Sequence, residues 1–374
     1  MSEWKEYRLG ELVSINARSI DRYYPYKNIE YLDTGSITRG KIEGFQSFDV
    51  EHAPSRAKRL VNDNDIIYST VRPIQRHYGI VKNPKPNLVV STGFAILSCD
   101  EKKTDANYIY FFLSSDEIVN YLDMVADGST SAYPSLTPDV IADMDILLPP
   151  LPEQKSIASI LSSLDDKIDL LHRQSKTLEA LAETLFRQWF VDEAEEGWEK
   201  GKLGDVIELI YGKALKEEIR SGSGFPVIGS SGVVGYHSEF LVEGPGIVIG
   251  RKGTLGKVIY LFESFFPIDT TYYVKSRVKS VGMFYEYFLL KTLNFEDMNS
   301  DSAVPGLNRD IALSAEIKIA PFDKLKQYNT HCASLFEKLK QNNSQIGTLT
   351  RLRDTLLPKL MSGEIRVKDT GRAA

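Results

Sequence analysis

The 374-residue sequence has little of what secreted, membrane or metal-dependent proteins need. Its two cysteines, Cys99 and Cys332, cannot form a disulfide framework, and with five scattered histidines they offer no zinc-ligand spacing. No apolar run approaches the roughly 18 residues of a membrane span. The polar N-terminal segment lacks the apolar stretch of a signal peptide. These absences exclude a disulfide-stabilised secreted protein and predict a cytoplasmic protein that has no membrane partner.

Recognisable catalytic motifs are missing as well. The sequence contains no G-x-G-x-x-G after a strand, no G-x-S-x-G, no H-E-x-x-H and no C-x-x-C. The glycine-rich run 250–257 lacks the spacing of a phosphate-binding loop, and Val258 stands where that loop needs a magnesium-binding Ser or Thr. His77, His172 and His237 are isolated in sequence, which favours structural roles. We therefore predict no catalytic site, no metal site and no cofactor, and a protein that works by binding.

Positive charge is clustered in two places. The net charge is -6 at pH 7, yet residues 54–85 hold seven basic side chains against only Asp63 and Asp65. Such a cluster suits a surface that contacts nucleic-acid phosphates, although a charge run is as often a solvated face. In the run 250–257, basic residues alternate with glycines that let backbone amides approach a phosphate closely, and the alternative is an ordinary glycine-rich turn. From the first cluster we predict DNA contacts by Lys58, Arg59, Arg72 and Arg76.

The sequence contains an internal duplication. The opening motif Trp-x-x-x-x-Leu-Gly at Trp4 recurs at Trp198. Further matched positions are separated by a constant 171 residues: Ala132, Pro134 and Leu136 pair with Ala303, Pro305 and Leu307, and 148–150 pairs with 319–321. A constant offset of this length indicates a duplicated domain plus its linker, because solenoid repeats have periods of about 20–50 residues.

Each half combines short strands with one long helix. β-Branched and aromatic runs such as 88–97, 246–250 and 257–262 predict the strands of an α+β domain. Proline breakers and capping residues predict the helices over 153–192 and 322–361. The segments 151–197 and 321–374 carry five basic against ten acidic residues and ten against five, so opposite charges favour pairing of the two helices.

Both helices carry residues at alternating steps of four and three, the spacing of a coiled-coil seam. The seam positions, each 171 residues from its counterpart, are Leu164, Ile168, Leu171, Ser175, Leu178, Ala182, Leu185 and Trp189 in the first helix and Leu335, Leu339, Asn342, Ile346, Leu349, Arg353, Leu356 and Leu360 in the second. We predict two similar mixed α/β domains held apart by two antiparallel coiled-coil helices, in a pseudo-twofold circular layout.

Several segments resemble the specificity subunit of type I restriction–modification enzymes. The starts at Trp4 and Trp198 resemble the opening of that family's target recognition domain, 147–157 resembles the start of its central helix, and 357–365 resembles its C-terminal end. The resemblance extends to the runs 229–237, 251–256 and 269–273, which are similar to one widespread version of the recognition domain. It covers essentially the whole chain.

The resemblance implies the following organisation and partners. Target recognition domain 1 spans 1–151, a central spacer helix 152–196, target recognition domain 2 197–320, and a C-terminal spacer helix and tail 321–374. Each recognition domain binds one half of a bipartite, asymmetric double-stranded DNA target. Two methyltransferase subunits bind the helices, restriction subunits join through them, and methyl transfer and DNA cleavage belong to those partners.

The resemblance also implies site residues. DNA contacts are expected at Ser230, His237, Arg251, Lys252, Thr254 and Lys257. Subunit docking and spacing are expected at Leu164, Ile168, Leu171, Leu178, Leu185, Leu335, Leu339, Ile346, Leu349 and Leu356. Because Asn342 and Arg353 replace Leu171 and Ala182 on the second seam, the two docking faces are not expected to be equivalent.

Two alternative hypotheses stay open. The first is a stand-alone two-domain DNA-binding protein with the same recognition unit. The second is a coiled-coil scaffold whose duplicated domains bind protein or sugar. DNA binding that weakens steeply with salt separates the DNA-binding hypotheses from the scaffold.

Overall fold

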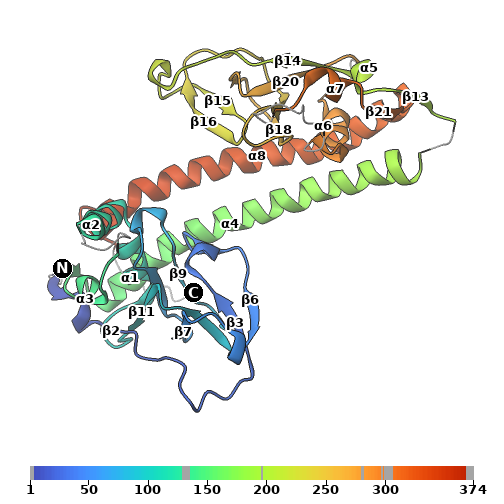
Figure 1. The fold of residues 1–374 in the computed structure, drawn as a ribbon. Helices are drawn as coiled ribbons and strands as arrows, with labels where there is room; N and C mark the ends of the chain where they lie inside the picture. Colours follow the sequence, from blue (N-terminus) through green and yellow to red (C-terminus); the bar gives the residue numbers. More distant parts are fainter. Residues whose placement is uncertain are drawn as a thin grey trace. The chain divides into compact units, whose positions relative to one another are not determined.

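The computed structural model describes residues 4–128, 135–194, 197–278, 282–295, 298 and 306–367. The chain divides into two compact units: unit 1 is Met1–Asp169 with Gly347–Ala374, and unit 2 is Leu170–Ile346. Each unit is a mixed α/β domain that includes parts of two long helices (Figure 1). The repeat positions Ala132, Pro134, Ala303 and Pro305 lie outside the described residues.

Besides its parts of the two long helices, unit 1 contains short strands and the three shorter α-helices α1 to α3. In hydrogen-bonded order, its sheets are β1 (Lys5–Arg8) with β12 (Asp145–Leu148); β2 (Val13–Ile15), β11 (Phe94–Cys99), β8 (Ile66–Ser69) and β9 (Tyr78–Ile80); β6 (Gln46–Asp49), β3 (Asn28–Leu32), β10 (Leu88–Ser91) and β7 (Ala57–Leu60); and β4 (Ile37–Thr38) with β5 (Lys41–Ile42). The helices are α1 (Ala106–Ser114), α2 (Asp116–Asp127) and α3 (Pro138–Ala142).

Local sequence explains several of these elements. Every residue of β8 is buried, as its β-branched and aromatic composition requires of a strand inside a sheet. The predicted run 88–97 forms parts of two strands in different sheets, because the chain turns between β10 and β11 at Thr92 and Gly93. Helix α1 begins where the Asp105 carboxylate accepts a hydrogen bond from the Tyr108 amide.

Unit 2 has the same kind of construction. Its sheets are β13 (Glu199–Lys202) with β21 (Glu316–Ile319); β14 (Ile207–Tyr211), β20 (Thr271–Ser276), β17 (Gly246–Gly250) and β18 (Val258–Leu261); and β16 (Gly232–His237), β15 (Phe225–Gly229) and β19 (Phe266–Pro267). Its helices are α5 (Leu203–Val206), α6 (Phe284–Thr292) and α7 (Arg309–Leu313).

The duplication in the sequence is present in the fold. The order β2-β11-β8-β9 in unit 1 corresponds to β14-β20-β17-β18 in unit 2. In each unit the first strand pairs antiparallel with the last, as β1 with β12 and β13 with β21. An isolated bridge joins Val71 to Ser135, and its counterpart joins Lys252 to Gly306. The two domains are therefore copies of one architecture.

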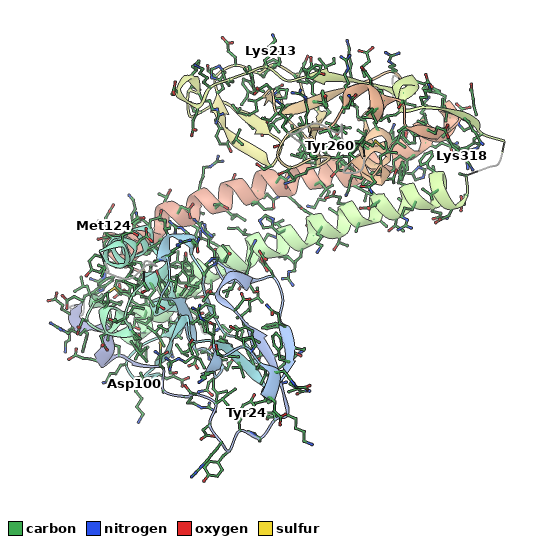
Figure 2. The ribbon with its side chains drawn as sticks, viewed as in Figure 1. Tyr24, Asp100, Met124, Lys213, Tyr260 and Lys318 are labelled. Atoms are coloured by element: carbon green, nitrogen blue, oxygen red, sulfur yellow. The ribbon has the colours of Figure 1, made fainter. Side chains whose placement is uncertain are left out.

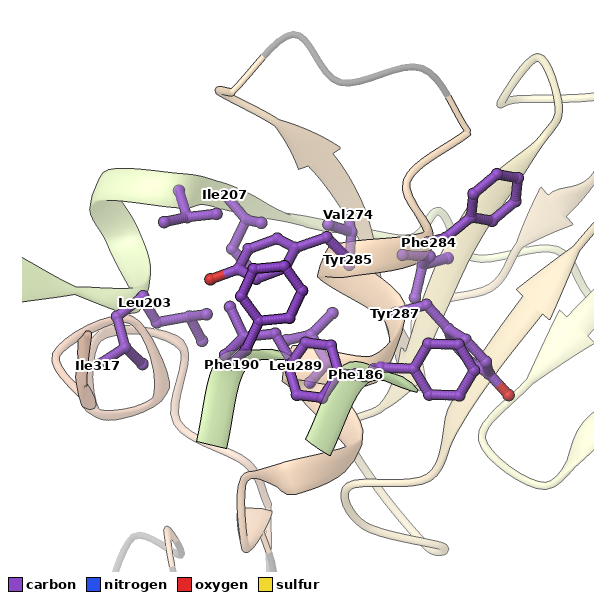
Figure 3. Close-up of a cluster of buried hydrophobic side chains, with 14 of the residues drawn as sticks. Phe186, Phe190, Leu203, Ile207, Val274, Phe284, Tyr285, Tyr287, Leu289 and Ile317 are labelled. Carbon is purple, nitrogen blue, oxygen red and sulfur yellow. The ribbon is translucent and has the colours of Figure 1, made fainter. Parts of the chain in front are cut away.

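Aromatic side chains dominate the core of unit 2. Phe186 and Phe190, from the last turns of the first long helix, lie against Tyr285 of α6, with ring centroids 5.7 and 4.8 Å apart (Figure 3). The Tyr328 hydroxyl donates a hydrogen bond of 2.9 Å to the Ala182 carbonyl. Buried residues of both long helices share one cluster with α6 and the strands of unit 2, so the helices are part of its core.

The two long helices are α4 (Leu151–Arg187, continued by a π-helical turn Gln188–Asp192) and α8 (Phe322–Met361). They pack antiparallel within each unit. In unit 1 the Arg353 guanidinium lies 2.9 Å from the Asp165 carboxylate, and in unit 2 the Asn342 amide donates to the Ser175 hydroxyl at 3.2 Å. The predicted antiparallel helices are confirmed. No helix among the described residues has a stretch long and apolar enough to cross a bilayer.

Polar residues on the α8 seam have partners on α4. Asn342 is fully buried and bonds Ser175, and Arg353 pairs with Asp165 next to the seam. A polar layer in an apolar seam fixes the register, because any sliding leaves a buried polar group without its partner. The two departures from an apolar seam therefore specify how α4 and α8 align.

The C-terminal segment packs beside the start of unit 1. Glu153, near the first turn of α4, accepts hydrogen bonds from Arg366 at 2.7 and 2.8 Å and from the Trp4 indole at 3.2 Å. The Arg366 guanidinium also lies 5.2 Å from the centre of the Trp4 ring. Gly363 has φ of +75°, which lets the chain turn against the same ring. This cluster joins the two chain segments that make up unit 1.

Replacing Arg366 with Ala should lower the melting temperature of the chain in a pH-dependent way. The Arg366 hydrogen bonds, aided by Trp4, hold the pKa of Glu153 below its usual value against the opposing effect of burial. A lowered folded-state pKa gives stabilisation that is complete above the usual pKa of about 4.3 and is lost as pH falls through the folded value. The difference in melting temperature should therefore be full at pH 7 and shrink toward pH 3. Arg8→Ala, which removes an exposed ion pair with Asp143, is the control that should change little. A difference that is independent of pH would contradict this role.

Candidate nucleic-acid interface

The connection between β17 and β18 in unit 2 is a loop whose shape depends on glycine. The backbone amides of Arg251 and Lys252 both donate to the Thr270 carbonyl, at 2.9 and 3.1 Å. A Cβ at Gly250 would lie 2.0 Å from the Thr254 carbonyl oxygen, so a larger residue does not fit there. Hydrogen bonds and close packing thus hold the start of the loop in place.

The β15–β16 turn lies against this loop. The Lys257 ammonium donates to the Ser231 carbonyl at 2.7 Å. A Cβ at Gly253 would lie 3.3 Å from the Ser230 hydroxyl. We call the predicted DNA-contact residues gathered here the unit 2 loop cluster: Ser230, Arg251, Lys252, Thr254 and Lys257.

Two residues that the sequence did not single out lie next to this cluster. Tyr211 ends β14, and its ring has the guanidinium of Arg251 at 4.9 Å and that of Arg309 at 5.4 Å from its centroid. Stacking on an aromatic ring orients a guanidinium and leaves its N–H groups available for other partners. No sequence signal indicated Tyr211 or Arg309, since each is far along the chain from Arg251.

The cationic side chains of the cluster differ in how many hydrogen bonds and ion pairs they make within unit 2. Arg251 donates to the Asp269 carbonyl at 3.1 Å, and Arg309 lies 3.3 Å from the Asp310 carboxylate. Lys252 is exposed and makes no ion pair or side-chain hydrogen bond with any described residue. Burial raises the pKa of the neighbouring Tyr272 to about 12, so its hydroxyl stays protonated and donates to the Leu307 carbonyl. Lys252 is therefore the cation most available to an anionic partner.

Unit 1 has the corresponding loop between β8 and β9. The Leu136 amide donates to the Thr70 carbonyl, as the Leu307 amide donates to the Arg251 carbonyl in unit 2. These bonds align Thr70 of unit 1 with Arg251 of unit 2. Arg72 lies two residues further along the same loop, is exposed and has φ of +46°.

Arg76 ends this loop in a different environment. Its guanidinium lies 2.8 Å from the Asp116 carboxylate at the start of α2, and its side chain is 16% exposed. Burial lowers the pKa of Arg76, but hydrogen bonds with Tyr78 and Asp116 outweigh it, and the net shift is upward. The charge of Arg76 is therefore already compensated within unit 1.

The other predicted contacts lie elsewhere in their units. Lys58 and Arg59 are on β7, in a different sheet from β8 and β9, and of the two only Lys58 is exposed. His237 is at the end of β16 far from the Ser230 turn, with its ring edge-on to Phe266. His237 is therefore outside the unit 2 loop cluster.

The sequence matches the family model "Type I restriction modification DNA specificity domain" over residues 1–180 and 195–353. The chain belongs to this family. It is 25% identical to the type I restriction enzyme HindI specificity subunit of Haemophilus influenzae, with 98% of this chain and 100% of that protein covered. It is 26% identical to the MjaIX specificity subunit of Methanocaldococcus jannaschii, with 98% and 89% covered. The solved S subunit from M. genitalium shares the fold at a TM-score of 0.61 and 21% identity, with 96% of each chain covered.

The chain is thus a DNA specificity subunit of a type I restriction–modification system, which is a non-catalytic component. The predicted fold of two mixed α/β domains joined by paired long helices is confirmed.

The predicted docking and spacing residues of this specificity subunit lie on the seam between α4 and α8. Ile168, Leu171 and Leu339 are buried. The remaining ones are half-buried: Leu164, Leu178, Leu185, Leu335, Ile346, Leu349 and Leu356. These side chains are at least partly buried, as helix pairing requires, whereas other faces of the two helices carry exposed residues.

Those other faces carry a repeated pattern that the sequence analysis missed. On α4 the exposed residues Thr177, Leu181 and Thr184 recur on α8, 171 residues later, as Thr348, Leu352 and Thr355. Leu181 is 48% exposed and Leu352 45%. We call these two sets the outer stripes of α4 and α8. The 171-residue offset of these residues is visible in the sequence. Only their exposure in the structure distinguishes them from the seam residues, which recur at the same offset.

Proposed function

We propose that each unit binds one half of a bipartite, asymmetric DNA target through the loop that follows its central buried strand. The observation that carries this proposal is the same loop in both units, β8–β9 and β17–β18, with an exposed cation in each. These cations are Arg72 and Lys252. Duplicated basic loops on duplicated domains suit a ligand that offers two similar anionic surfaces, as duplex DNA does.

We assign the contacts within unit 2 by chemistry. Lys252, Thr254 and Lys257 bind phosphates, because they are exposed donors without a planar geometry. Arg251 and Arg309, oriented on Tyr211, contact base edges, because a guanidinium can form two parallel hydrogen bonds with guanine in the major groove. In unit 1 we keep Lys58, Arg59 and Arg72 as DNA contacts, and Arg76 has a structural role.

The long helices set the spacing of the two half-sites and bind two methyltransferase subunits, one on each outer stripe. A repeated exposed pattern supports a partner present in two copies, since nothing in the helix pair itself requires Thr, Leu and Thr at the same three outward positions. Restriction subunits join through the methyltransferases, and the complex works on DNA in the cytoplasm. The recognition domains are 1–151 and 197–320, with spacer helices over 152–196 and 321–374.

The test of DNA binding compares Lys252→Ala with Lys318→Ala. Lys318 is exposed on β21 outside the unit 2 loop cluster and is labelled in Figure 2. Removing one phosphate contact should weaken binding to all duplexes about equally and reduce the slope of log affinity against log salt by about one unit. The affinity of both variants and of the unaltered chain is measured on random and on target duplexes at several salt concentrations.

The outcomes separate the candidate functions. If Lys252→Ala binds like Lys318→Ala, with the same salt slope, the β17–β18 loop has no part in DNA binding. If the unaltered chain shows no salt-dependent binding at all, the proposed phosphate contacts of both units are wrong. Methylome sequencing of a host that expresses the chain with its methyltransferase subunit then gives the target.

A further inference from the structure

A pocket of about 590 Å³ lies in unit 2 between α8, the end of β18 and the start of α6. Five aromatic side chains line it: Tyr260, Phe262, Phe284, Phe322 and Phe336. Figure 2 marks Tyr260, whose ring lies 4.9 Å from that of Phe336. Phe322 at the rim is 56% exposed. A pocket this apolar and open to solvent is typical of a binding site for an apolar group.

The polar groups of the pocket are mostly donors. Asn329 is 5% exposed, and its carbonyl oxygen accepts the Tyr285 amide at 3.1 Å, while its Nδ2 has no partner among the described residues. Lys326 and Lys340 form no ion pair with any described residue. Glu337 is the acidic member of the lining and accepts from Gln341 at 3.4 Å. The occupant therefore needs an apolar group together with hydrogen-bond acceptors.

In unit 1 a hairpin lies at the position that corresponds to this pocket. Strands β4 and β5 form a hairpin against β9, where the Gly40 amide donates to the Tyr78 carbonyl at 2.7 Å. A Cβ at Gly79 would lie 2.6 Å from the Ile37 side chain, so glycine lets the hairpin approach closely. The Lys41 ammonium lies 3.8 Å from Asp169 of α4.

The internal duplication relates the pocket of unit 2 to the site of the β4–β5 hairpin in unit 1. The edge strands β9 and β18 hold the same position in their sheets, and α1 contacts β9 as α6 contacts β18. Asp165 and Asp169 of α4 are 171 residues before Phe336 and Lys340 of α8. Among the described residues of unit 2, the hairpin of β15 and β16 forms a sheet with β19, and β18 has its main element contacts with β17 and α6 alone.

We propose that the aromatic pocket of unit 2 receives a turn of the partner methyltransferase subunit, with an apolar side chain in the pocket and a carboxylate against Lys340. The turn takes the place that the hairpin of residues 37–42 occupies in unit 1. Lys340 of α8 holds the position in unit 2 that Asp169 of α4 holds in unit 1, so the charge on the helix is reversed. In unit 1 the hairpin pairs Lys41 with Asp169, and the partner therefore has to present an acidic residue to Lys340. This inference rests on the proposed function, which supplies the methyltransferase as the partner.

The test uses the full chain and the purified methyltransferase subunit of the same host. Ala333→Trp fills the pocket from an exposed lining position, and Lys340→Glu reverses the charge at its rim. Each should weaken the complex by about 10-fold or more, because the turn is excluded or repelled. Lys318→Trp, at an exposed position of the same unit outside the pocket lining, is the matched control. Melting temperature and DNA affinity of all three variants should equal those of the unaltered chain.

Photo-crosslinking gives an independent readout. A photoreactive benzoylphenylalanine in place of Phe322 should crosslink to the methyltransferase, and the same residue in place of Lys318 should not. Equal affinities for Ala333→Trp and the control, with no crosslink from position 322, overturn the pocket proposal while leaving the proposed function in place. If the unaltered chain forms no complex with the methyltransferase, the proposed function itself fails, and this partner with it.

Discussion

One heptad inserted after Ser175, with a matching heptad after Ile346, should move the two methylated half-sites apart by about three base pairs. The seven residues add about 10 Å of helix at about 1.5 Å per residue, and one base pair takes about 3.4 Å. The half-site sequences should not change, because the loops β8–β9 and β17–β18 are untouched. The measurement is the methylated motif of each variant in a host that expresses the methyltransferase subunit.

The structure supports the choice of these positions. Ser175 bonds to Asn342, four residues before Ile346, so the two insertions fall a little more than one helical turn apart along the antiparallel helix pair. A full heptad keeps the seam in register, whereas a two-residue insertion rotates it out of the interface and should abolish assembly. If the heptad variant methylates the original spacing, the helices do not set the distance and this mechanism is wrong.

Glutamate at Leu181 and at Leu352 should remove the two methyltransferase subunits one at a time. Each leucine is about half exposed on its outer stripe, and burying a charge in an apolar contact is unfavourable. We expect each single variant to lose one methyltransferase and the double variant to lose both, with affinity at each site reduced by at least about 10-fold, or about 1.4 kcal/mol. Native mass spectrometry of the purified complexes measures the stoichiometry.

Leu147→Glu is the control for this experiment. Leu147 is 46% exposed on β12, away from both outer stripes, so its substitution should leave two methyltransferases bound. DNA affinity should be unchanged in every variant, since no loop residue is altered. A double variant that still carries two methyltransferases would show that the outer stripes are not the docking faces.

Residues close together in sequence made part of the site predictable. Arg251, Lys252 and Lys257 are on one loop, and the glycines between them already indicate in the sequence a close approach to a partner. Tyr211 and Arg309 join that loop only because β14, β17 and the start of α7 meet in unit 2. Arg76 was indistinguishable from Arg72 in sequence, and only the fold places Asp116 beside it.

The sequence by itself determined the duplication, the two helices and their pairing. Repeated motifs and a four–three spacing can be read directly from the order of the residues. It also carried the family resemblance, which the family match bears out. Tertiary structure decided which faces of the helices remain exposed and which cations are compensated. It also decided that the place taken by residues 37–42 in unit 1 is an open pocket in unit 2. Burial and charge compensation depend on contacts between segments that are distant in the sequence, and only the folded chain forms those contacts.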